Sequence, residues 1–383
     1  MSPFRDIAIG WRWVENIKLL IWTDPKDSKE IPERNIKFTI KIRIMIKVGV
    51  AGFGTIGKRV VDAINAQSDM EIVGIAKTSS SLESEFIEHR YGLFGVTDEN
   101  VQSMDSAGHD VIGSLEELVN LCDIIVDCSP SGHGERNKQV YVNNKTPAVF
   151  QGGENATVAK ESFNSYVAKS DDVNYNDSEY TRVVSCNTTG LSRIITPLSS
   201  RFDVQDVEAT LMRRAGDPRE TSRGPINEVV RSHSIPSHHA GDVNELLPEL
   251  DIHTMAVKVP TTSMHMHSVR ITLDEKANSV LDFLHKKNRI SIVPNKYTVD
   301  SAGGLTEIAN LESRPFGSVW ENTVWENTFD QNEDTLRFFQ GVHQRSITVP
   351  ETIDAVRTMM GGDIEESIET TDKSLGIDKP LLK

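Results

Sequence analysis

The sequence is poor in cysteine and has no long apolar run. Its 383 residues include three cysteines, and neither these nor the histidines are spaced as zinc ligands. We therefore expect no disulfide framework and no metal, and a reducing compartment is favoured. No apolar stretch approaches the length of a membrane span, and residues 1–22 mix charged with apolar residues, unlike a signal peptide. We expect a cytoplasmic protein with no membrane partner.

Positive charge is also scarce. Lys and Arg number 41 against 56 Asp and Glu, which gives a formal net charge of −15 at pH 7. A general nucleic-acid binder needs a basic face, so this balance excludes that class. An anionic ligand must instead be met by a few local cations. The length and the 38% hydrophobic content predict two globular domains with sizeable cores.

Residues 1–44 differ from the rest of the chain. They hold more Lys and Arg than Asp and Glu, although the remainder is acidic, and Met45 stands where the rest of the chain would naturally start, just before an apolar strand pattern. Every even position from Ile36 to Val50 is apolar, an alternation typical of a strand, but a strand of that length is unusual. We predict that residues 1–44 are an extension peripheral to the fold.

Three glycines follow an apolar strand pattern at residues 46–51. They are spaced Gly-x-Gly-x-x-Gly and lead into a helical pattern. This order suits a dinucleotide: the first glycine allows a tight turn, the second a close approach of a pyrophosphate, and the third close packing of helix on strand. The predicted contacts are Gly52, Gly54, Thr55, Ile56 and Gly57. A plain strand-to-helix turn is the alternative.

The next strand pattern, residues 71–76, ends in Lys77 and Thr78, where an NAD-specific site usually places an acidic residue. No carboxylate is present there to bind a ribose 2′-hydroxyl or to repel a 2′-phosphate. Lys77 and the hydroxyl groups after it suit a 2′-phosphate, so we expect NADP, with NAD as the alternative. A solvated lysine in a polar loop is the plainer interpretation.

Cys186 lies where a strand pattern passes into a helical one. It follows two valines and Ser185, and the short polar residues 187–189 come after it. The N–H groups and the dipole at a helix N-terminus favour a thiolate, the form that attacks carbonyl carbon. We predict that Cys186 is a nucleophile and that residues 187–189 cap the helix or donate to an oxyanion. A small buried cysteine at the end of a strand is the alternative.

Small residues follow two further strand patterns, at residues 123–128 and 148–150. Small residues after successive parallel strands form the crevice in which such sheets bind ligands. Cys128 ends the first of these patterns and is a rival nucleophile, but Pro130 disfavours a helix directly after it. Later in the chain, Arg213 and Arg214 follow an apolar strand pattern, and an arginine pair in an acidic protein suits an anion.

Several motifs, in order, resemble the archaeal (type II) phosphorylating glyceraldehyde-3-phosphate dehydrogenases, from Met45 to the C-terminus. The motifs are GFGTIGKRV at 52–60, FQGGE at 150–154, TRVVSCNTTGL at 181–191, GPIN at 224–227, PSHH at 236–239, TMAV at 254–257 and VPTT at 259–262. The resemblance implies oxidation of glyceraldehyde 3-phosphate with inorganic phosphate to 1,3-bisphosphoglycerate, through a thioester on Cys186. It also implies a homotetramer.

The resemblance assigns His265 as the general base. His265 and His267 alternate on a predicted strand and share one face, so their spacing alone does not choose between them. The resemblance adds substrate contacts at Ser185, Cys186, Asn187, His238 and His239. It adds cofactor contacts at Gly152, Arg214 and Gln344.

The expected fold is α/β: a Rossmann doubly wound parallel sheet plus an α+β catalytic domain with a mixed or antiparallel sheet. The resemblance places the first domain at 45–185, the catalytic domain at 186–345, and a final helix within 346–383 that returns to the first domain. Pro350 suits the first turn of that helix. A repeat of VWENT at 319–323 and 324–328 departs from the family, and we predict a surface or interface loop there.

Two alternatives remain. One is another acyl-phosphate reductase, such as an aspartate-semialdehyde dehydrogenase, which also pairs a cysteine with a histidine but calls for a bidentate arginine toward its carboxylate substrate. The other is a non-catalytic cofactor-binding regulator, which would bind the nucleotide without turnover that depends on a thiol.

Overall fold

The computed structural model describes residues 45–151, 153–170, 175–216, 224, 227–274, 279–379 and 381–382, and the backbone of 8–14 and 17–23. The chain divides into two compact units, residues 1–43 and 44–383. In the first, β1 (Ala8–Val14) pairs antiparallel with β2 (Ile17–Thr23). The predicted peripheral role of residues 1–44 stays a prediction, and the alternation from Ile36 lies largely outside the described residues.

A parallel sheet begins the second unit, in the order β6-β5-β4-β3-β7-β8-β10-β9. Its strands are β3 (Ile46–Ala51), β4 (Met70–Lys77), β5 (Gly92–Gly95), β6 (Gly113–Ser114), β7 (Ile124–Asp127), β8 (Ala148–Phe150), β9 (Glu161–Phe163) and β10 (Tyr180–Val183). The order reverses at β3, which pairs with β4 on one side and β7 on the other. Ligands bind outside the carboxyl ends of parallel strands at such a point.

Helices connect the strands of this sheet. They are α1 (Thr55–Asn65), α2 (Leu82–Glu88), α3 (Asp98–Ser106), α4 (Leu115–Val119), α5 (Gly134–Asn144) and α6 (Ser165–Ser170). Val60 and Ile64 of α1 are buried with Val48 and Val50 of β3 in one apolar core. Because helices cover the central strands, these strands are apolar on both sides, as a doubly wound sheet requires.

The second sheet is mixed, in the order β12-β13-β11-β14-β18-β16-β15, with β17 beside β18. Its strands are β11 (Val204–Arg214), β12 (Val230–Arg231), β13 (Asp251–Val259), β14 (His265–Leu273), β15 (Ile290–Val293), β16 (Asn322–Trp325), β17 (Asp330–Asn332) and β18 (Thr335–Val342). β11 is parallel to β13 and antiparallel to β14. The predicted fold class, a parallel Rossmann sheet with a mixed second sheet, is confirmed.

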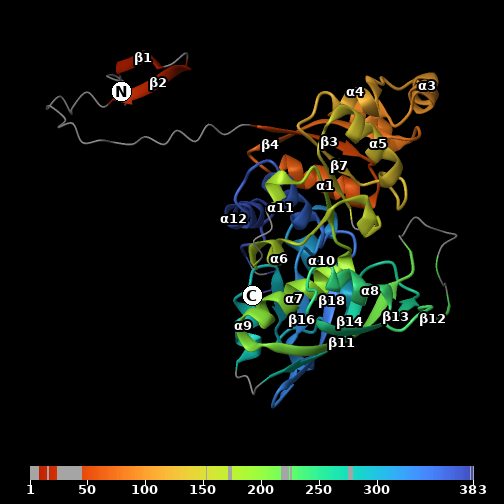
Figure 1. Cartoon of the computed structure of the whole chain (residues 1–383), viewed down its shortest axis with the longest axis vertical. Helices are drawn as coiled ribbons and strands as arrows, with labels where there is room; N and C mark the ends of the chain where they lie inside the picture. Colours follow the sequence, from red (N-terminus) through yellow and green to blue (C-terminus); the bar gives the residue numbers. More distant parts are fainter. Residues whose placement is uncertain are drawn as a thin grey trace. The chain divides into compact units, whose positions relative to one another are not determined.

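The long helix α7 (Cys186–Phe202) packs on the mixed sheet (Figure 1). Its Leu191, Ile195 and Leu198 share a buried core with Val207 and Leu211 of β11. The other helices of this region are α8 (His238–Asn244), α9 (Val280–His285) and α10 (Ala302–Leu311). Short 3-10 turns lie at Ala156–Val158, Tyr175–Asp177, Pro315–Gly317 and Glu326–Thr328. This packing holds the N-terminus of α7 beside the start of β14, an interior strand of the mixed sheet.

The C-terminal segment returns to the parallel sheet as two helices, α11 (Val349–Met359) and α12 (Ile364–Ser374), where the sequence predicted one (Figure 1). Pro350 lies in the first turn of α11, as predicted. Ile353 and Val356 of α11 join Val60 of α1 in the same apolar core. The return of the chain to the first sheet therefore rests on apolar packing.

A fully buried ion cluster ties these helices to the mixed-sheet region. Arg193 of α7 lies 2.6 Å from Glu351 of α11, and Arg289 lies 2.7 Å from both Asp354 and Asp372. These acidic groups raise the pKa of Arg289 against the effect of burial, so its charge is retained. Removing one member of such a cluster leaves the others buried and uncompensated, which is costly.

The prediction for the VWENT repeat is wrong. Residues 319–325 are buried, and Trp320 and Trp325 are 1% and 5% exposed. Asn322–Trp325 forms β16, which pairs with β18 on one side and β15 on the other. Only the end of the second copy, around Asn327, reaches the surface. The apolar residues of the repeat are buried because they pack into three apolar cores: Trp320 into the first, Val324 into the second, and Val319 with Trp325 into another.

Candidate active site

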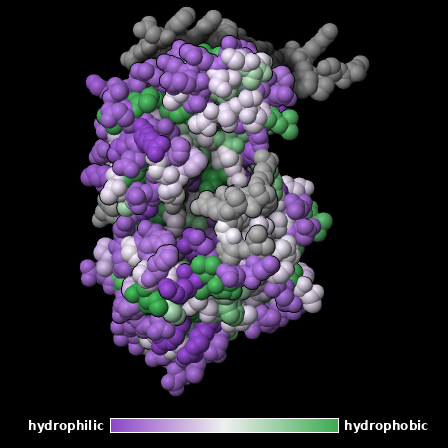
Figure 2. All heavy atoms as spheres, turned by 90° about the vertical axis from the view of Figure 1, so that its right-hand side faces the viewer, coloured by the Kyte–Doolittle hydropathy of each residue, from purple (hydrophilic) through white to green (hydrophobic). Residues whose placement is uncertain are grey.

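A cleft of about 720 Å³ holds the predicted catalytic and substrate residues. Figure 2 shows a mainly hydrophilic face that is hollowed between an upper and a lower lobe. Residues from the first sheet's loops, from α7 and α8, and from β11, β13 and β14 line the cleft together. The site is thus formed where the two sheets meet.

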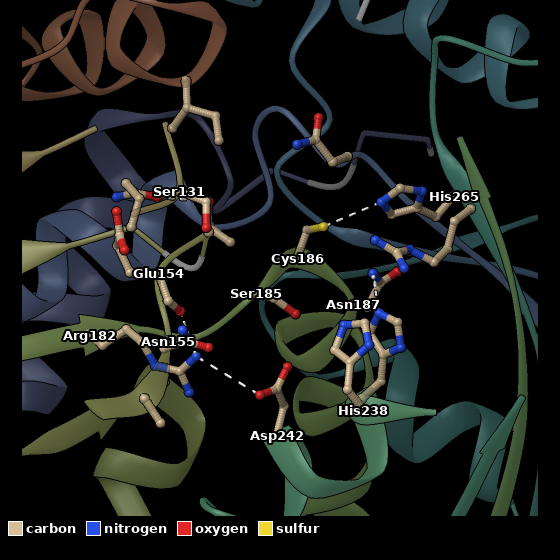
Figure 3. Close-up of a pocket in the computed structure, with 18 of the residues that line it drawn as sticks. Ser131, Glu154, Asn155, Arg182, Ser185, Cys186, Asn187, His238, Asp242 and His265 are labelled. Atoms are coloured by element: carbon tan, nitrogen blue, oxygen red, sulfur yellow. Dashed lines mark hydrogen bonds and ion pairs between the residues drawn. The ribbon is translucent and has the colours of Figure 1, made fainter. Parts of the chain in front are cut away.

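Cys186 is the first residue of α7, and its side chain points toward His265 (Figure 3). The Sγ atom lies 3.3 Å from His265 Nε2. Ser185 is the N-cap of the helix, and its hydroxyl accepts a hydrogen bond from the Thr188 N–H at 3.3 Å. The strand-to-helix junction predicted from the sequence therefore presents the thiol to the cleft.

Burial raises the pKa of the Cys186 thiol, although the side chain remains partly exposed to the cleft. The charges of Arg213 and Arg214 and the backbone N–H groups at the start of α7 lower it, and they do not fully offset burial. The helix N-terminus therefore acts in the predicted direction, but alone it does not make the thiolate the dominant form at neutral pH.

His265 begins β14 and is 4% exposed. Its Nδ1 accepts a hydrogen bond from the backbone N–H of Arg214 at 2.9 Å. Since a backbone N–H can only donate, the neutral ring carries its proton on Nε2 and donates it toward Cys186 Sγ. Burial, followed by His267 and the two arginines, lowers the pKa of His265 well below its usual value. The ring is therefore neutral at physiological pH.

Basic side chains gather around this pair. Arg213 and Lys258 lie side by side in the register of β11 and β13, and His238 begins α8. Arg214 donates from Nε to the Gln344 side-chain oxygen at 2.9 Å. Burial, followed by Arg213, lowers the pKa of His238. In a chain with a net charge of −15, this local concentration of cations suits an anionic ligand.

The glycine turn has the geometry that a dinucleotide requires. Gly52 has a φ of +93°, which favours glycine, and a Cβ atom on Gly57 would lie 2.1 Å from the Gly52 carbonyl oxygen. A Cβ atom on Gly54 would meet nothing within 4 Å, so the space beside it is open. Thr55 and Ile56 start α1, and Ile56 also lines the cleft. The residues present therefore fit a pyrophosphate at this helix N-terminus.

Lys77 and Thr78 lie at the carboxyl end of β4, beside the glycine turn and outside the lining of the cleft. Lys77 Nζ donates to the Ser81 hydroxyl at 2.8 Å. Burial lowers the pKa of Lys77 while Glu83 opposes this shift. Gly152 lies outside the described residues.

The rival nucleophile, Cys128, does not line the cleft. Burial, followed by Asp127, raises the pKa of its thiol well above the usual value. Its carbonyl carbon would lie 3.0 Å from a Cβ on Gly52, so it packs behind the glycine turn. This position favours the structural interpretation of the segment.

Sequence reasoning did not single out several residues that line the cleft. Arg182, in β10, is 2% exposed and bonds Glu245 at 2.7 Å, with Asp242 beside it (Figure 3). The Glu154 carboxylate accepts hydrogen bonds from the Gly132 and Gly134 N–H groups and so holds the loop after β7. For Arg182 the available signal was a charged residue within the strand pattern just before Val183 and Val184. No sequence pattern pointed to Lys258, because Arg213, which lies beside it in the sheet, is distant in sequence.

Two further findings limit the kind of site. Within the described ranges, His, Cys, Asp and Glu side chains do not form a group of three that could hold a metal ion. Among these same residues, each helix is too short or too polar to cross a bilayer.

The fold and the site define a class of protein in which a nucleotide-binding parallel sheet meets a mixed sheet over a cysteine–histidine pair. Comparison with known proteins agrees with this class. Residues 185–311 match the model described as "Glyceraldehyde 3-phosphate dehydrogenase, C-terminal domain", and residues 46–160 match "Dihydrodipicolinate reductase, N-terminus".

Similar full-length proteins narrow the class. A glyceraldehyde-3-phosphate dehydrogenase of Halobacterium salinarum is 44% identical, covering 87% of this chain and 100% of its own. Those of Thermoplasma volcanium and Saccharolobus solfataricus are each 42% identical, covering 88% of this chain and 99% and 100% of theirs. The chain belongs to the glyceraldehyde-3-phosphate dehydrogenase family, an oxidoreductase family with a nucleotide-binding Rossmann domain.

Proposed function

We propose that this chain oxidises D-glyceraldehyde 3-phosphate with inorganic phosphate to 1,3-bisphosphoglycerate, and catalyses the reverse reduction. The observation that carries the proposal is the Cys186 thiol at a helix N-terminus, 3.3 Å from His265 Nε2, in a cleft lined by basic side chains. Family membership supports it.

The Cys186 thiolate attacks the aldehyde carbon and forms a hemithioacetal alkoxide. The proton lost when the thiol ionises leaves to solvent, so the later oxidation of the alkoxide needs no further proton acceptor. When bound, the nicotinamide supplies the hydride acceptor. A thioester then remains on Cys186, and a phosphate oxygen attacks it, so that the carbon–sulfur bond breaks and the thiolate returns.

The geometry gives His265 a first role as donor. With Nδ1 engaged by Arg214, the Nε2–H points at the position where the thiolate and then the alkoxide carry negative charge. The general-base role that the resemblance implies stays a prediction. It requires a free lone pair on Nε2, so the ring proton would have to sit on Nδ1, where it would face the Arg214 N–H.

The basic side chains are proposed to hold the two phosphate groups. Arg213, Lys258 and His238 surround the cleft on the side of the mixed sheet, and His239 is buried behind His238. Ser185 and Asn187, at the start of α7, lie next to the nucleophile. Guanidinium and ammonium groups suit phosphate, whereas a carboxylate substrate calls for one bidentate arginine.

For the cofactor we propose NADP over NAD. Lys77 offers an ammonium group at the end of β4, where an acidic residue would favour NAD. The family and the Rossmann domain support use of a nicotinamide dinucleotide without distinguishing the two. We also propose two sets of cofactor contacts. The first comes from the glycine turn, at Gly52, Gly54, Thr55, Ile56 and Gly57, and the second from Arg214 and Gln344 at the cleft.

The domain boundaries at residues 45–185, 186–345 and 346–383, a homotetramer and a cytoplasmic location also stay proposals. Limited proteolysis followed by mass spectrometry tests the boundaries. Light scattering of the purified protein tests the tetramer, for which a monomeric or dimeric mass is the contrary result.

The deciding experiment follows formation of reduced nicotinamide from glyceraldehyde 3-phosphate, with and without inorganic phosphate, using NADP and NAD in turn. We expect turnover that depends on phosphate and is abolished in Cys186→Ala. Cys122→Ala, outside the cleft, is the matched control and should retain turnover. Turnover only with aspartate semialdehyde would instead support the rival reductase. Cofactor binding without turnover would support the non-catalytic cofactor-binding regulator.

A further inference from the structure

Behind the nucleophile lies a continuous chain of buried side-chain hydrogen bonds that crosses the mixed sheet to α8. Its members, each at most 2% exposed, are Asn322, Gln340, His267, Asn187, His239, Ser237 and Thr254. The successive links measure 3.0, 3.0, 2.9, 3.2, 3.0 and 2.8 Å. These residues come, in the same order, from β16, β18, β14, α7, α8, the N-cap of α8 and β13.

The direction of the chain is set at one end by a backbone carbonyl. The Gly190 oxygen accepts hydrogen bonds from both Asn322 Nδ2 and Gln340 Nε2. A carbonyl oxygen can only accept, so both amides must turn their NH₂ groups toward it. Gln340 therefore presents its oxygen to Asn322 and an N–H to the next member, His267.

This orientation propagates to the residue beside the nucleophile. Since Gln340 donates to His267 Nδ1, the neutral His267 ring carries its proton on Nε2 and donates it to the Asn187 side-chain oxygen. Asn187 is thereby held with its NH₂ group turned away from His267. One of its N–H groups bonds His239 Nε2, and Asn187 is among the residues that line the cleft.

The far end of the chain agrees with the same direction. Because His239 Nε2 accepts from Asn187, its Nδ1 carries the proton and donates to the Ser237 hydroxyl. Ser237 then donates to Thr254, whose hydroxyl donates to the Ser237 carbonyl at 3.2 Å. Every link has one donor and one acceptor, so the links can form in one direction only, and the Asn322 side-chain oxygen at the end of the chain is left without a partner among the described residues.

We propose that Gln340 and Asn322 are positioning residues of the active site, which act through His267 to fix the amide orientation of Asn187 and the tautomer of His239. Neither touches the cleft. Their effect on catalysis rests on the dehydrogenase activity proposed above, but the hydrogen-bond order itself does not.

The chain also explains how two histidines remain neutral beside positive charge. Protonation of His267 would place an Nδ1–H against the Gln340 NH₂, and turning Gln340 would place its oxygen against the Gly190 carbonyl. Burial first, and then Arg213, lowers the pKa of His267 to about 3. Burial, Arg213, His238 and His267 together lower that of His239 to about 2. Neutral rings keep the acceptor sites on which the order depends.

A first experiment reads the order directly, without any substrate. Selective ¹⁵N-histidine labelling and NMR of the full chain report which ring nitrogen of each histidine carries hydrogen, with His267→Gln and His239→Gln used for assignment. We expect His267 as the Nε2–H form and His239 as the Nδ1–H form, both unchanged across the neutral pH range. The opposite tautomers, or titration of either ring in that range, would overturn the proposal.

A second experiment measures the consequence. Gln340→Leu removes the hydrogen-bond donor to His267 with little change in side-chain volume. We expect kcat/KM for glyceraldehyde 3-phosphate to fall about tenfold, because one buried hydrogen bond that orients Asn187 is lost. The rate of Cys186 alkylation and the KM for the cofactor should not change, because the Cys186–His265 pair is untouched. Asn322→Leu should shift kcat/KM in the same direction.

The matched control is Thr323→Val, which alters a fully buried residue next to Asn322 on β16 that is outside the chain. It should leave kcat/KM unchanged. Equal losses in Gln340→Leu and Thr323→Val, or a parallel loss of thiol reactivity, would mean general damage to the sheet and would overturn the positioning role. If Gln340→Leu does not fold, the NMR measurement on the unaltered chain decides.

Discussion

Replacing His265 with glutamine separates two roles for this ring. The glutamine Nε2 can reach the position of the histidine Nε2 and donate a hydrogen bond, but the amide is not a base. In the structure His265 Nε2 lies 3.3 Å from Cys186 Sγ, and Nδ1 is held by the Arg214 N–H. If His265 acts as a donor, His265→Gln should lose much less activity than His265→Ala.

The size of the effect follows from the number of donors removed. Loss of one donor aimed at a developing oxyanion costs about 10²–10³ in kcat, which is the expected loss for His265→Ala. His265→Gln keeps the donor but not the bond to the Arg214 N–H, so we expect a loss of about tenfold. Single-turnover reduction of the cofactor is the assay, because it isolates the step in which the charge develops.

The pH dependence gives an independent check with a defined sign. Burial and the neighbouring cations lower the pKa of His265 well below 6.5. The functional neutral ring is therefore present above that lowered pKa, and the loss of activity that comes from His265 should appear only as the pH drops through it, separately from the thiolate dependence on Cys186. His265→Gln should lack this acid limb. Equal losses in the glutamine and alanine variants, with an acid limb near neutrality in the unaltered enzyme, would refute the donor role and support the general base.

Four further predictions concern other parts of the molecule. Burial raises the pKa of Cys186 above its usual value. The thiolate fraction, and with it the rate of alkylation by iodoacetamide, should therefore rise about tenfold per pH unit between about pH 7 and about pH 9. A rate that levels off near neutrality would contradict this. Lys77→Ala should raise the KM for NADP roughly tenfold or more and leave the KM for NAD unchanged, since one charge-assisted hydrogen bond is lost; equal effects on both would remove the basis for NADP preference. Gly54→Val should weaken cofactor binding without changing the melting temperature. Gly57→Ala should also lower the melting temperature, because its Cβ would meet the Gly52 carbonyl oxygen at 2.1 Å. The reverse pattern would show that the turn is misassigned. Arg289→Met should lower the free energy of unfolding by about 3–5 kcal/mol in denaturant titrations, since Asp354 and Asp372 are left buried without their partner; a change within error would show that the cluster is not stabilising.

Local patterns in the sequence were enough for the elements that depend on neighbouring residues. The glycine turn at Gly52 and Gly57 follows from backbone space within one strand–turn–helix unit, and the helix start at Cys186 follows from the Ser185 cap. Pro350 at the start of α11 is of the same kind. In each case a few consecutive residues determine the conformation, so the pattern can be recognised without the rest of the fold.

The VWENT repeat shows where such patterns are insufficient. Its tryptophans and polar residues gave no indication of an interior strand, and we predicted a surface or interface loop. The strand is interior because β15 and β18, distant in sequence, pair with its two edges, and its side chains are buried because Val324 and Trp325 pack into separate apolar cores. Burial of this kind depends on strand order, which is a property of the whole sheet.

The same division applies within the active site. The sequence by itself determined that His265 and His267 share one face of a strand, that Cys186 starts a helix, and that a nucleotide-binding turn lies near the beginning of the second unit. Only the tertiary structure decided that His265 meets Cys186 and the Arg214 N–H, while His267 meets Gln340 and Asn187. The physical reason is that these contacts join residues 51 to 80 positions apart, and such contacts depend on how strands are ordered and registered rather than on local conformational preference.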